Sequence, residues 1–520
     1  MGATKALLNP TKIVLLAILI VSSALMVRNM SQPWNGLDGG DGALFSKIAK
    51  NYLEHGIWEL KFGQAYNYLP GQDKDSLKYY QHHPPLLPLL IAGSFAVFGE
   101  NEAAARLVPI LFSLASIVLL YKISKQSYGE NVAITATFIF ASFPAILFFA
   151  RKPGYEPLSL FFILLSLYYY NLIRDMYGKK GYIAFFLAMG AGLLTDWPVY
   201  FLLSILCLHF FISQKGTKRI VFPTILMCYG LIIFLVFECF SYLVDPKSFT
   251  DLVNQGLVYM GVIDLDHELA NRYEEVKVTF TPSLYTKRLL SRLDLLYTYP
   301  LVIVSVVGFV WFLGKKRLLK SNVIILLSVA ATYCIVFYRS VYIHYWHTYF
   351  FAAPFAVLSA IFISSTILGN DIGHKNEKFT PLVKWIHPLA VFFFLLVIGG
   401  SLPRLIDLHT LQEKVLPDEQ HEHAMLIKSL SLKIKELSSP NDIIITNLAE
   451  GPKTPLTYYA ERNIIFESDF DKGYNNFKKS KSHKMVWWIE KEGSLFEFPP
   501  NTRHSRFNLY GQNFVLLSHM

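Results

Sequence analysis

The sequence predicts a polytopic α-helical membrane protein with a small soluble α/β domain at its C-terminal end. Apolar runs of membrane-spanning length recur as far as residue 401, and the chain beyond that point is polar. Only 17% of the 520 residues are charged, whereas a soluble domain has about a quarter. The mean hydropathy of +0.36 agrees with this composition. An ordinary soluble protein is therefore excluded.

The first apolar run covers residues 13–26 and follows Lys5 and Lys12. No small-residue cleavage site follows the run, so we expect a retained membrane anchor rather than a secretory signal peptide. The two lysines place the N-terminus on the cytoplasmic side.

Clusters of lysine and arginine recur between the apolar runs and explain most of the net charge of +10. This is the positive-inside pattern of membrane proteins, so we expect no nucleic-acid partner. If each cluster marks a cytoplasmic turn, two crossings separate consecutive clusters. The rule predicts about eleven membrane helices, and up to about thirteen if further apolar segments cross. The expected spans are residues 12–28, 103–121, 130–150, 155–173, 181–196, 197–213, 220–243, 299–314, 321–338, 348–368 and 386–401.

The apolar segment 84–99 is too short for an ordinary span and begins with prolines. We expect it to be re-entrant or interfacial, because counting it as a span would move the next basic turn to the outer side. The polar segments 29–83, 151–154, 244–298 and the tail then lie on the outer face.

The tail forms the second of two expected domains, a membrane domain over residues 1–401 and an outer α/β domain over residues 402–520. Residues 419–437 have the spacing of an amphipathic helix. Four short apolar runs predict strands, at residues 442–446, 463–466, 485–489 and 514–517.

Two acidic residues, Asp38 and Asp41, lie in a glycine-rich stretch directly after the first span. Helical spacing of apolar residues begins at Ala43, so Asp41 could be the N-cap of that helix. It could equally provide a reactive carboxylate at the membrane surface. The two roles are compatible.

Two histidines, His82 and His83, precede the Pro-Pro pair of the short apolar segment. They could be ordinary polar surface, or they could bind a phosphate or a divalent metal cation. No cysteine or carboxylate at metal-ligand spacing completes a metal site with them.

Charged residues also occur at the outer ends of the expected helices. Arg151, with Glu156 nearby, could anchor a helix at the membrane boundary or clamp an anion. Asp196 lies inside a nearly continuous apolar stretch, where an ionisable residue suggests function, although it could also cap the helix that Pro198 begins.

A cluster of aromatic and basic residues precedes Pro354. An aromatic belt at the membrane boundary explains tyrosines such as Tyr345. It does not explain Arg339, His344 and His347, which suit a lipid-phosphate headgroup.

Together these motifs resemble the GT-C glycosyltransferases, in particular the dolichyl-phosphate-mannose protein mannosyltransferases and the bacterial aminoarabinose transferase of lipid A. The resemblance covers roughly residues 10–400. Many relatives have Asp-Glu where this chain has Asp41-Gly42. The motifs that carry the resemblance are specific in combination, whereas each alone is weak: Asp41-Gly42-Ala43, His83-Pro84-Pro85-Leu86 and Ala105-Arg106-Leu107.

The resemblance implies transfer of a sugar from a polyprenyl-phosphate donor to a lipid, protein or glycan acceptor on the non-cytoplasmic face. Asp41 falls where the family places its catalytic acid, and a single base fits an inverting single displacement. Cations would hold the leaving phosphate. The residues expected to bind the phosphate are Arg151, His82, His83, Arg339 and His344; those expected to orient the substrates are Asp38, Asp196, Glu156, His347 and Tyr345.

Other functions remain open at this point. A transporter or flippase of a lipid or polyprenyl phosphate is the main alternative, but no internal repeat is visible and the polar residues gather on one face. A membrane-anchored assembly protein is a further alternative. We expect an integral protein of a bacterial inner membrane that contacts membrane lipids, with its site and tail domain outside. No cofactor is certain, and His82 and His83 are the candidates for holding a divalent metal cation.

Overall fold

The computed structural model describes most of the chain and divides it into two compact units. The first unit contains residues 1–28, 82–86 and 109–412, and the second contains residues 29–81, 87–108 and 413–520. The described residues are 10–34, 36–67, 77–174, 179–263, 281–314, 321–367, 420–440, 442–447, 455–466, 474–475, 477, 479, 483–489, 502–509 and 512–519.

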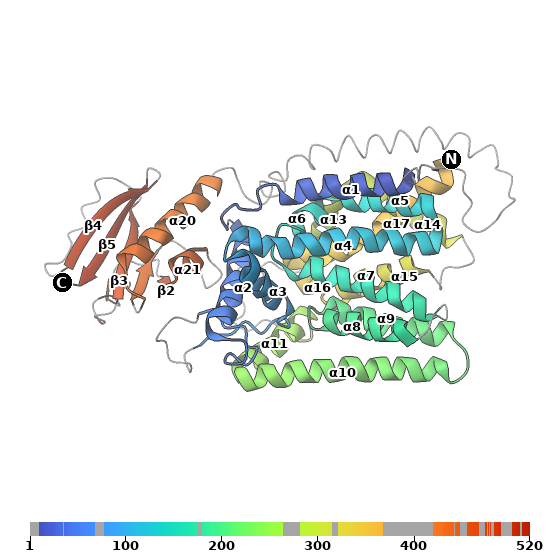
Figure 1. Ribbon diagram of the computed structural model, residues 1–520, viewed down its shortest axis with the longest axis horizontal. Coiled ribbons are helices and arrows are strands. Elements are labelled where there is room, and N and C mark those ends of the chain that lie inside the picture. Colours follow the sequence, from blue (N-terminus) through green and yellow to red (C-terminus); the bar gives the residue numbers. More distant parts are fainter. Residues whose placement is uncertain are drawn as a thin grey trace, which may run out of the picture. The chain divides into compact units, whose positions relative to one another are not determined.

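The first unit is helical. Long apolar helices run alongside one another in it, as α1, α4, α7 and α10 show (Figure 1). Its helices are α1 (Pro10–Val27), most of α4 (Glu102–Tyr128), α5 (Glu130–Ser142), α6 (Pro144–Phe149), α7 (Tyr155–Arg174), α8 (Lys179–Leu193), α9 (Pro198–Ser213), α10 (Lys218–Val244), α11 (Pro246–Tyr259), α13 (Pro282–Tyr297), α14 (Tyr299–Leu313), α15 (Asn322–Val336), α16 (Tyr338–Ile343), the 3-10 helix η4 (Trp346–Phe351) and α17 (Ala352–Ile367).

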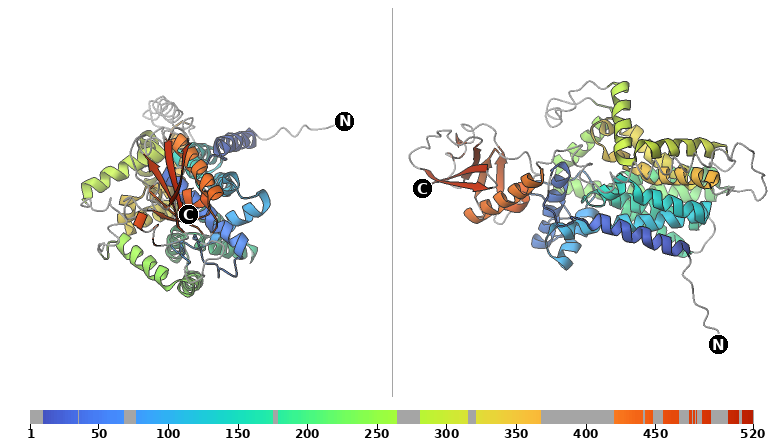
Figure 2. Two further views of the ribbon diagram at one scale, coloured as in Figure 1. Left: turned by 90° about the vertical axis from the view of Figure 1, so that its left-hand side faces the viewer. Right: turned by 90° about the horizontal axis from the view of Figure 1, so that it is seen from above.

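Five of the described helices are long and apolar enough to cross a membrane: α1, α4, α7, α10 and the continuous stretch Trp346–Thr366. A sixth candidate is the pair α13 and α14, which is bent by 101° (Figure 2). Helices occupy ten of the eleven expected spans, and the eleventh, residues 386–401, lies outside the described residues. The number of crossings stays a prediction.

The surface of α10 agrees with a lipid environment. Apolar side chains along it are exposed, among them Ile225, Leu231 and Leu235, while Leu226 and Phe237 on its other side are buried. α10 packs against α9, α9 against α15, α14 against α17, and α17 against α5.

The expected span 130–150 is not continuous. It breaks between α5 and α6 at Phe143, whose backbone is extended (φ −67°, ψ 130°). The reason is Pro144, because proline disfavours the helical conformation of the residue before it.

The second unit contains helices from the N-terminal region and a five-stranded sheet. The strands lie in the order β2-β1-β3-β5-β4; β1 is parallel to β2 and β3, and β5 is antiparallel to β3 and β4. The elements are α2 (Gly36–His55), α3 (Leu86–Phe98), α20 (Gln420–Leu437), β1 (Ile443–Thr446), α21 (Pro455–Ala460), β2 (Asn463–Phe466), β3 (His483–Ile489), β4 (Thr502–Leu509) and β5 (Gln512–His519).

The amphipathic helix expected over residues 419–437 coincides with α20, whose apolar face contributes Leu426, Leu430 and Ile434 to a core shared with Val486 and Phe514 of the sheet. The four expected strands coincide with β1, β2, β3 and β5, whereas β4 and α21 were not expected. The expected domain boundary at residue 401 lies outside the described residues and stays a prediction.

Candidate active site

A buried carboxylate and a histidine pair with each other in the first unit. Asp196 follows α8 and is 5% exposed. Its Oδ1 atom lies 2.9 Å from Nδ1 of His83 and 2.7 Å from the backbone nitrogen of Trp197. Its Oδ2 atom lies 3.4 Å from the Ser159 hydroxyl on α7. The expectation that Asp196 is the N-cap of α9 is wrong, because Trp197 holds that position and Asp196 bonds to its N–H instead.

The histidine motif is fixed to α7 and to the start of α9. The His83 ring stacks on Tyr155 with centroids 4.4 Å apart. The indole nitrogen of Trp197 donates to the backbone carbonyl of His82 at 3.0 Å. Both histidines are half-buried. The structure therefore brings His83 and Asp196 together, although 113 positions separate them.

A metal site is incomplete around this pair. Within the residues that the structure describes, no three histidine, cysteine, aspartate or glutamate side chains are grouped closely enough to hold a metal ion. We therefore derive no chemical step through a metal.

Two cations lie in the turn between α6 and α7. Burial, with a smaller contribution from Arg28, lowers the pKa of Arg151 below the usual value of arginine. Lys152 is 5% exposed, and its ammonium lies 4.9 Å from the Trp346 ring centre. It also lies over the ring of Tyr345. Such cation–π contacts stabilise a charge that has lost its water.

Lys152 was not among the expected site residues. Its adjacency to Arg151 was the available signal, but the sequence could not show that the lysine is buried among aromatic rings. Glu156, in the first turn of α7, is 8% exposed. A Cβ atom at Gly154 would lie 2.4 Å from its Oε2 atom, so a side chain at that position would displace the Glu156 carboxylate.

The histidines of the aromatic cluster lie near these groups. His344 stacks on Trp346 at 4.1 Å, and His347 stacks on Tyr333 at 5.0 Å. His347 lies within electrostatic range of both His83 and His344. His344 and His347 thus lie with their ring centres 6.2 Å apart, and both His344 and His83 interact electrostatically with His347.

Arg339 has different contacts. It donates to the backbone carbonyl of Ile263 at 3.1 Å and to the Tyr338 hydroxyl at 3.3 Å. Its expected phosphate-binding role stays a prediction.

Asp41 belongs to the second unit, where it is half-buried in α2. The expectation that it begins a helix is wrong, because α2 already starts at Gly36 and Asp41 lies in its second turn. Asp38 lies on the same helix, and its side chain is outside the described part. The catalytic role of Asp41 and the orienting role of Asp38 stay predictions.

The structure gives a reason for the glycine after Asp41. A Cβ atom at Gly42 would lie 2.5 Å from ring carbons of Trp34, which is itself 1% exposed. Arg106 lies over that indole, 4.2 Å from its centre, and donates to the carbonyls of Met30 and Gln32. The indole is thereby fixed, and no side chain fits at residue 42 beside it.

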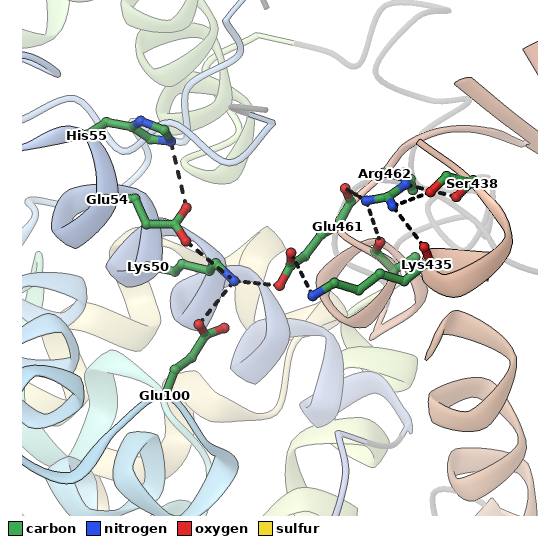
Figure 3. Close-up of polar contacts among 9 residues, drawn as sticks. Lys50, Glu54, His55, Glu100, Lys435, Ser438, Glu461 and Arg462 are labelled. Carbon is green, nitrogen blue, oxygen red and sulfur yellow. Dashed lines mark hydrogen bonds and ion pairs between the residues drawn. The ribbon is translucent and has the colours of Figure 1, made fainter. Parts of the chain in front are cut away.

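An ion-pair network joins α2 to the C-terminal part of the same unit (Figure 3). The Lys50 ammonium lies 2.5 Å from Glu461 and 3.1 Å from Glu100, and Glu461 also pairs with Lys435 at 2.8 Å. Burial alone would raise the pKa of Glu461, but the bonds from Lys435 and Lys50 outweigh burial and lower that pKa to about 2. Burial lowers the pKa of the neighbouring Lys47 to about 8.

A second set of contacts ties the segment before Asp41 to the same region. The Tyr459 hydroxyl accepts from the Trp34 backbone N–H at 2.9 Å and donates to Glu102 at 2.6 Å. Lys428 donates to the same carboxylate at 2.7 Å. The helix that carries Asp41 is therefore held by α20 and α21 as well as by its own neighbours.

A family model and a curated relative each match part of the chain. The family model for dolichyl-phosphate-mannose-protein mannosyltransferase matches residues 82–242. YkcB from Bacillus subtilis (strain 168), which carries the name putative mannosyltransferase, is 29% identical over 143 residues. That match spans 26% of this chain and only 20% of the relative's length.

Two solved structures share the fold. ArnT from Cupriavidus metallidurans, bound to undecaprenyl phosphate, matches with a TM-score of 0.58 and 13% identity, over 97% of both chains. The oligosaccharyltransferase AglB from Archaeoglobus fulgidus, in complex with an inhibitory peptide and a dolichol-phosphate, matches with a TM-score of 0.55 and 13% identity, over 92% of this chain and 70% of that one. The predicted resemblance is confirmed at the level of the fold: the chain shares the fold of these GT-C glycosyltransferase structures, and residues 82–242 match the mannosyltransferase family model.

Proposed function

We propose that this protein is a membrane glycosyltransferase that moves a sugar from a polyprenyl-phosphate donor to a lipid, protein or glycan acceptor. One observation carries the proposal. The segment 82–242 that matches the mannosyltransferase family model contains the His83–Asp196 pair, the turn with Arg151 and Lys152, and Glu156. The likeness to a structure that holds undecaprenyl phosphate supports the choice of donor.

The chemistry needs cations around the leaving group more than it needs an acid. The donor is a phosphate diester and its leaving group, polyprenyl phosphate, departs as an anion, so positive charge and N–H donors that face that phosphate lower the barrier. Arg151 and Lys152 supply positive charge in one unit, and His83 and His344 of the same unit are further proposed contacts to the phosphate. Arg339 and His82 are further proposed contacts to the phosphate.

The acceptor needs one base. Asp41 takes the proton from the acceptor hydroxyl or amine as the acceptor attacks the anomeric carbon, and the bond from that carbon to the phosphate oxygen breaks. One base without a carboxylate nucleophile gives inversion at the anomeric carbon. Asp38, Asp196, Glu156, His347 and Tyr345 orient the substrates. The reaction takes place on the outer face of a bacterial inner membrane.

Asp41→Asn tests the proposal. Membranes with the wild-type chain or the variant receive a panel of polyprenyl-phosphate sugars with native lipid and protein acceptors, and transfer is measured at equal levels of folded protein. Loss of the base should lower transfer by about a hundredfold or more. Asp251→Asn is the matched control, because Asp251 is also half-buried on a helix, α11.

Full transfer by Asp41→Asn would overturn the assignment of the base and direct attention to Asp38 or Asp196. An absence of transfer by the wild type across a broad donor panel, with folding intact, would favour a transporter of polyprenyl phosphate instead.

A further inference from the structure

A carboxylate is buried on α10 where the helix faces its neighbours in the bundle. Glu238 is 8% exposed, although Val236 and Phe240 beside it are largely exposed. Its Oε2 atom has no hydrogen-bond partner within the described part of the chain. A buried carboxylate without a partner is costly, and an ionisable residue inside a membrane helix usually has a function.

Two hydroxyl groups near Glu238 are also buried and also lack a hydrogen-bond partner among the described residues. Ser241 lies one turn further along α10 and is 2% exposed. Tyr200 belongs to the first turn of α9, which packs against α10, and its phenol lies within electrostatic range of Glu238. Neither hydroxyl has a hydrogen-bond partner among the described residues. Glu238, Tyr200 and Ser241 therefore form a group whose buried polar atoms make no hydrogen bonds to one another.

An aromatic side chain connects this group to the candidate active site. The Trp197 ring lies 5.8 Å from Tyr200 and 6.2 Å from Phe237, which precedes Glu238. The indole N–H of Trp197 donates to the backbone carbonyl of His82, and the backbone N–H of Trp197 donates to the Asp196 carboxylate. Trp197 is thus shared between the Glu238 group and the His83–Asp196 pair.

The chemistry of the Glu238 group selects its ligand. A phosphate would be repelled by the carboxylate, and an acyl chain would leave all three polar groups unsatisfied. The hydroxyls of a sugar can donate to Glu238 and exchange hydrogen bonds with Tyr200 and Ser241, and the apolar face of the ring can lie against an indole. We propose that Glu238, Tyr200, Ser241 and Trp197 form a binding site for the donor sugar, beside the groups that hold its phosphate. This inference rests on the proposed function.

The test compares two ligands on the full-length protein in nanodiscs. One is undecaprenyl phosphate, and the other is the best donor of a panel in which the same lipid carries mannose, glucose or aminoarabinose. Glu238→Gln should weaken binding of the sugar-bearing lipid by roughly ten- to a hundredfold, because an NH₂ group replaces one of the two acceptor oxygens at a buried position. Binding of undecaprenyl phosphate should not change.

The matched control is Tyr242→Phe, which removes the hydroxyl of a tyrosine that is 53% exposed on the same helix. It should leave both affinities unchanged. Tyr200→Phe removes one hydroxyl from the site and provides the same comparison if Glu238→Gln does not fold.

The remaining outcomes would contradict the inference. If Glu238→Gln and Tyr200→Phe bind the sugar-bearing lipid as the wild type does, or weaken both lipids equally, the sugar is not bound here and the proposed function is untouched. If the wild type binds neither lipid, the proposed function and this inference both fail.

Discussion

Asp196 accepts hydrogen bonds from parts of the chain that are far apart in sequence. Because an ionised carboxylate can only accept, its Oδ1 atom requires the proton of His83 to lie on Nδ1. The carboxylate thereby fixes the tautomer and the orientation of the His83 ring. The pair therefore holds the imidazole in one orientation at the candidate site.

Asp196→Asn should therefore impair transfer while it preserves the shape of the site. We expect the catalytic efficiency for the donor to fall about tenfold, since a charged hydrogen bond becomes a neutral one. The measurement is the initial rate against donor concentration. Ser159→Ala is the control, because its 3.4 Å contact with Asp196 is weak and its loss should cost less than about threefold. Wild-type kinetics in Asp196→Asn would contradict this role.

At the level of the element, α2 depends on the close approach of Gly42 to Trp34. Gly42→Ala places a methyl group against a buried indole that Arg106 holds in position. We expect a loss of about 1–3 kcal/mol in the free energy of unfolding, as overpacking usually costs. Thermal unfolding of the purified protein in detergent measures it.

Gly256→Ala is the matched control for that prediction. Gly256 lies inside α11, and a Cβ atom there would meet nothing within 4 Å. The substitution should be neutral or stabilise by up to about 1 kcal/mol, because alanine favours the helix. Equal destabilisation by both variants would show that the indole contact is irrelevant.

The network around Lys50 should couple α2 to the C-terminal part of its unit. Lys50→Met and Glu461→Gln should each destabilise the protein, and the double variant should lose less than the sum, with a coupling of about 1 kcal/mol or more. The Lys50 side chain is only 11% exposed, so solvent screens the pair weakly.

The corresponding cycle on Lys433 and Glu436 is the control. These side chains are 36% and 65% exposed and pair at 2.9 Å on α20. Their coupling should stay below about 0.5 kcal/mol, as for other surface pairs. A Lys50–Glu461 coupling no larger than this would contradict the proposed connection. Thermal unfolding of the six variants decides between the two outcomes.

For the whole molecule, the charge pattern predicts which ends of the helices face the cytoplasm. In a variant without the four native cysteines, Lys215→Cys occupies the exposed turn between α9 and α10, and Ser439→Cys occupies an exposed site after α20. An impermeant maleimide should label residue 439 on intact cells and residue 215 only after permeabilisation. Labelling of residue 215 from outside would reverse the topology.

Much of the architecture follows from local patterns, and the failures have physical causes. Long apolar runs predicted the positions of helices such as α7 and α10, and short apolar runs predicted four of the five strands. The start of α2 was missed because glycine is a poor helix former, and contacts around Trp34 override that tendency. β4 was missed because its sequence, with Arg503, His504 and Arg506, lacks an apolar run.

The features of the candidate site also divide into those that the sequence predicted and those that depend on how the helices pack. An ionisable residue in an apolar stretch predicted a role for Asp196, and basic residues in an aromatic cluster predicted one for His347. Both roles stay predictions. The pairing of Asp196 with His83 and the aromatic surroundings of Lys152 depend on how α7, α9 and η4 pack. Glu238 carries the same signal as Asp196, an acid in an apolar run, but was not among the expected site residues, because a single acid in a long apolar helix does not show which way it faces.

The bend at Thr298 has a consequence for the membrane that holds this protein. The chain turns through 101° there, so α13 lies across the end of α14, and Arg292 of α13 donates to the carbonyl of Tyr342 at 2.8 Å. A bilayer whose thickness differs from the length of a spanning helix tilts that helix. Because α13 is joined to α14 and bonds to Tyr342, a tilt of α14 would also move Tyr342 and the adjoining segment that contains His344. The acyl-chain length of the host lipids would thereby act on the geometry of the candidate site.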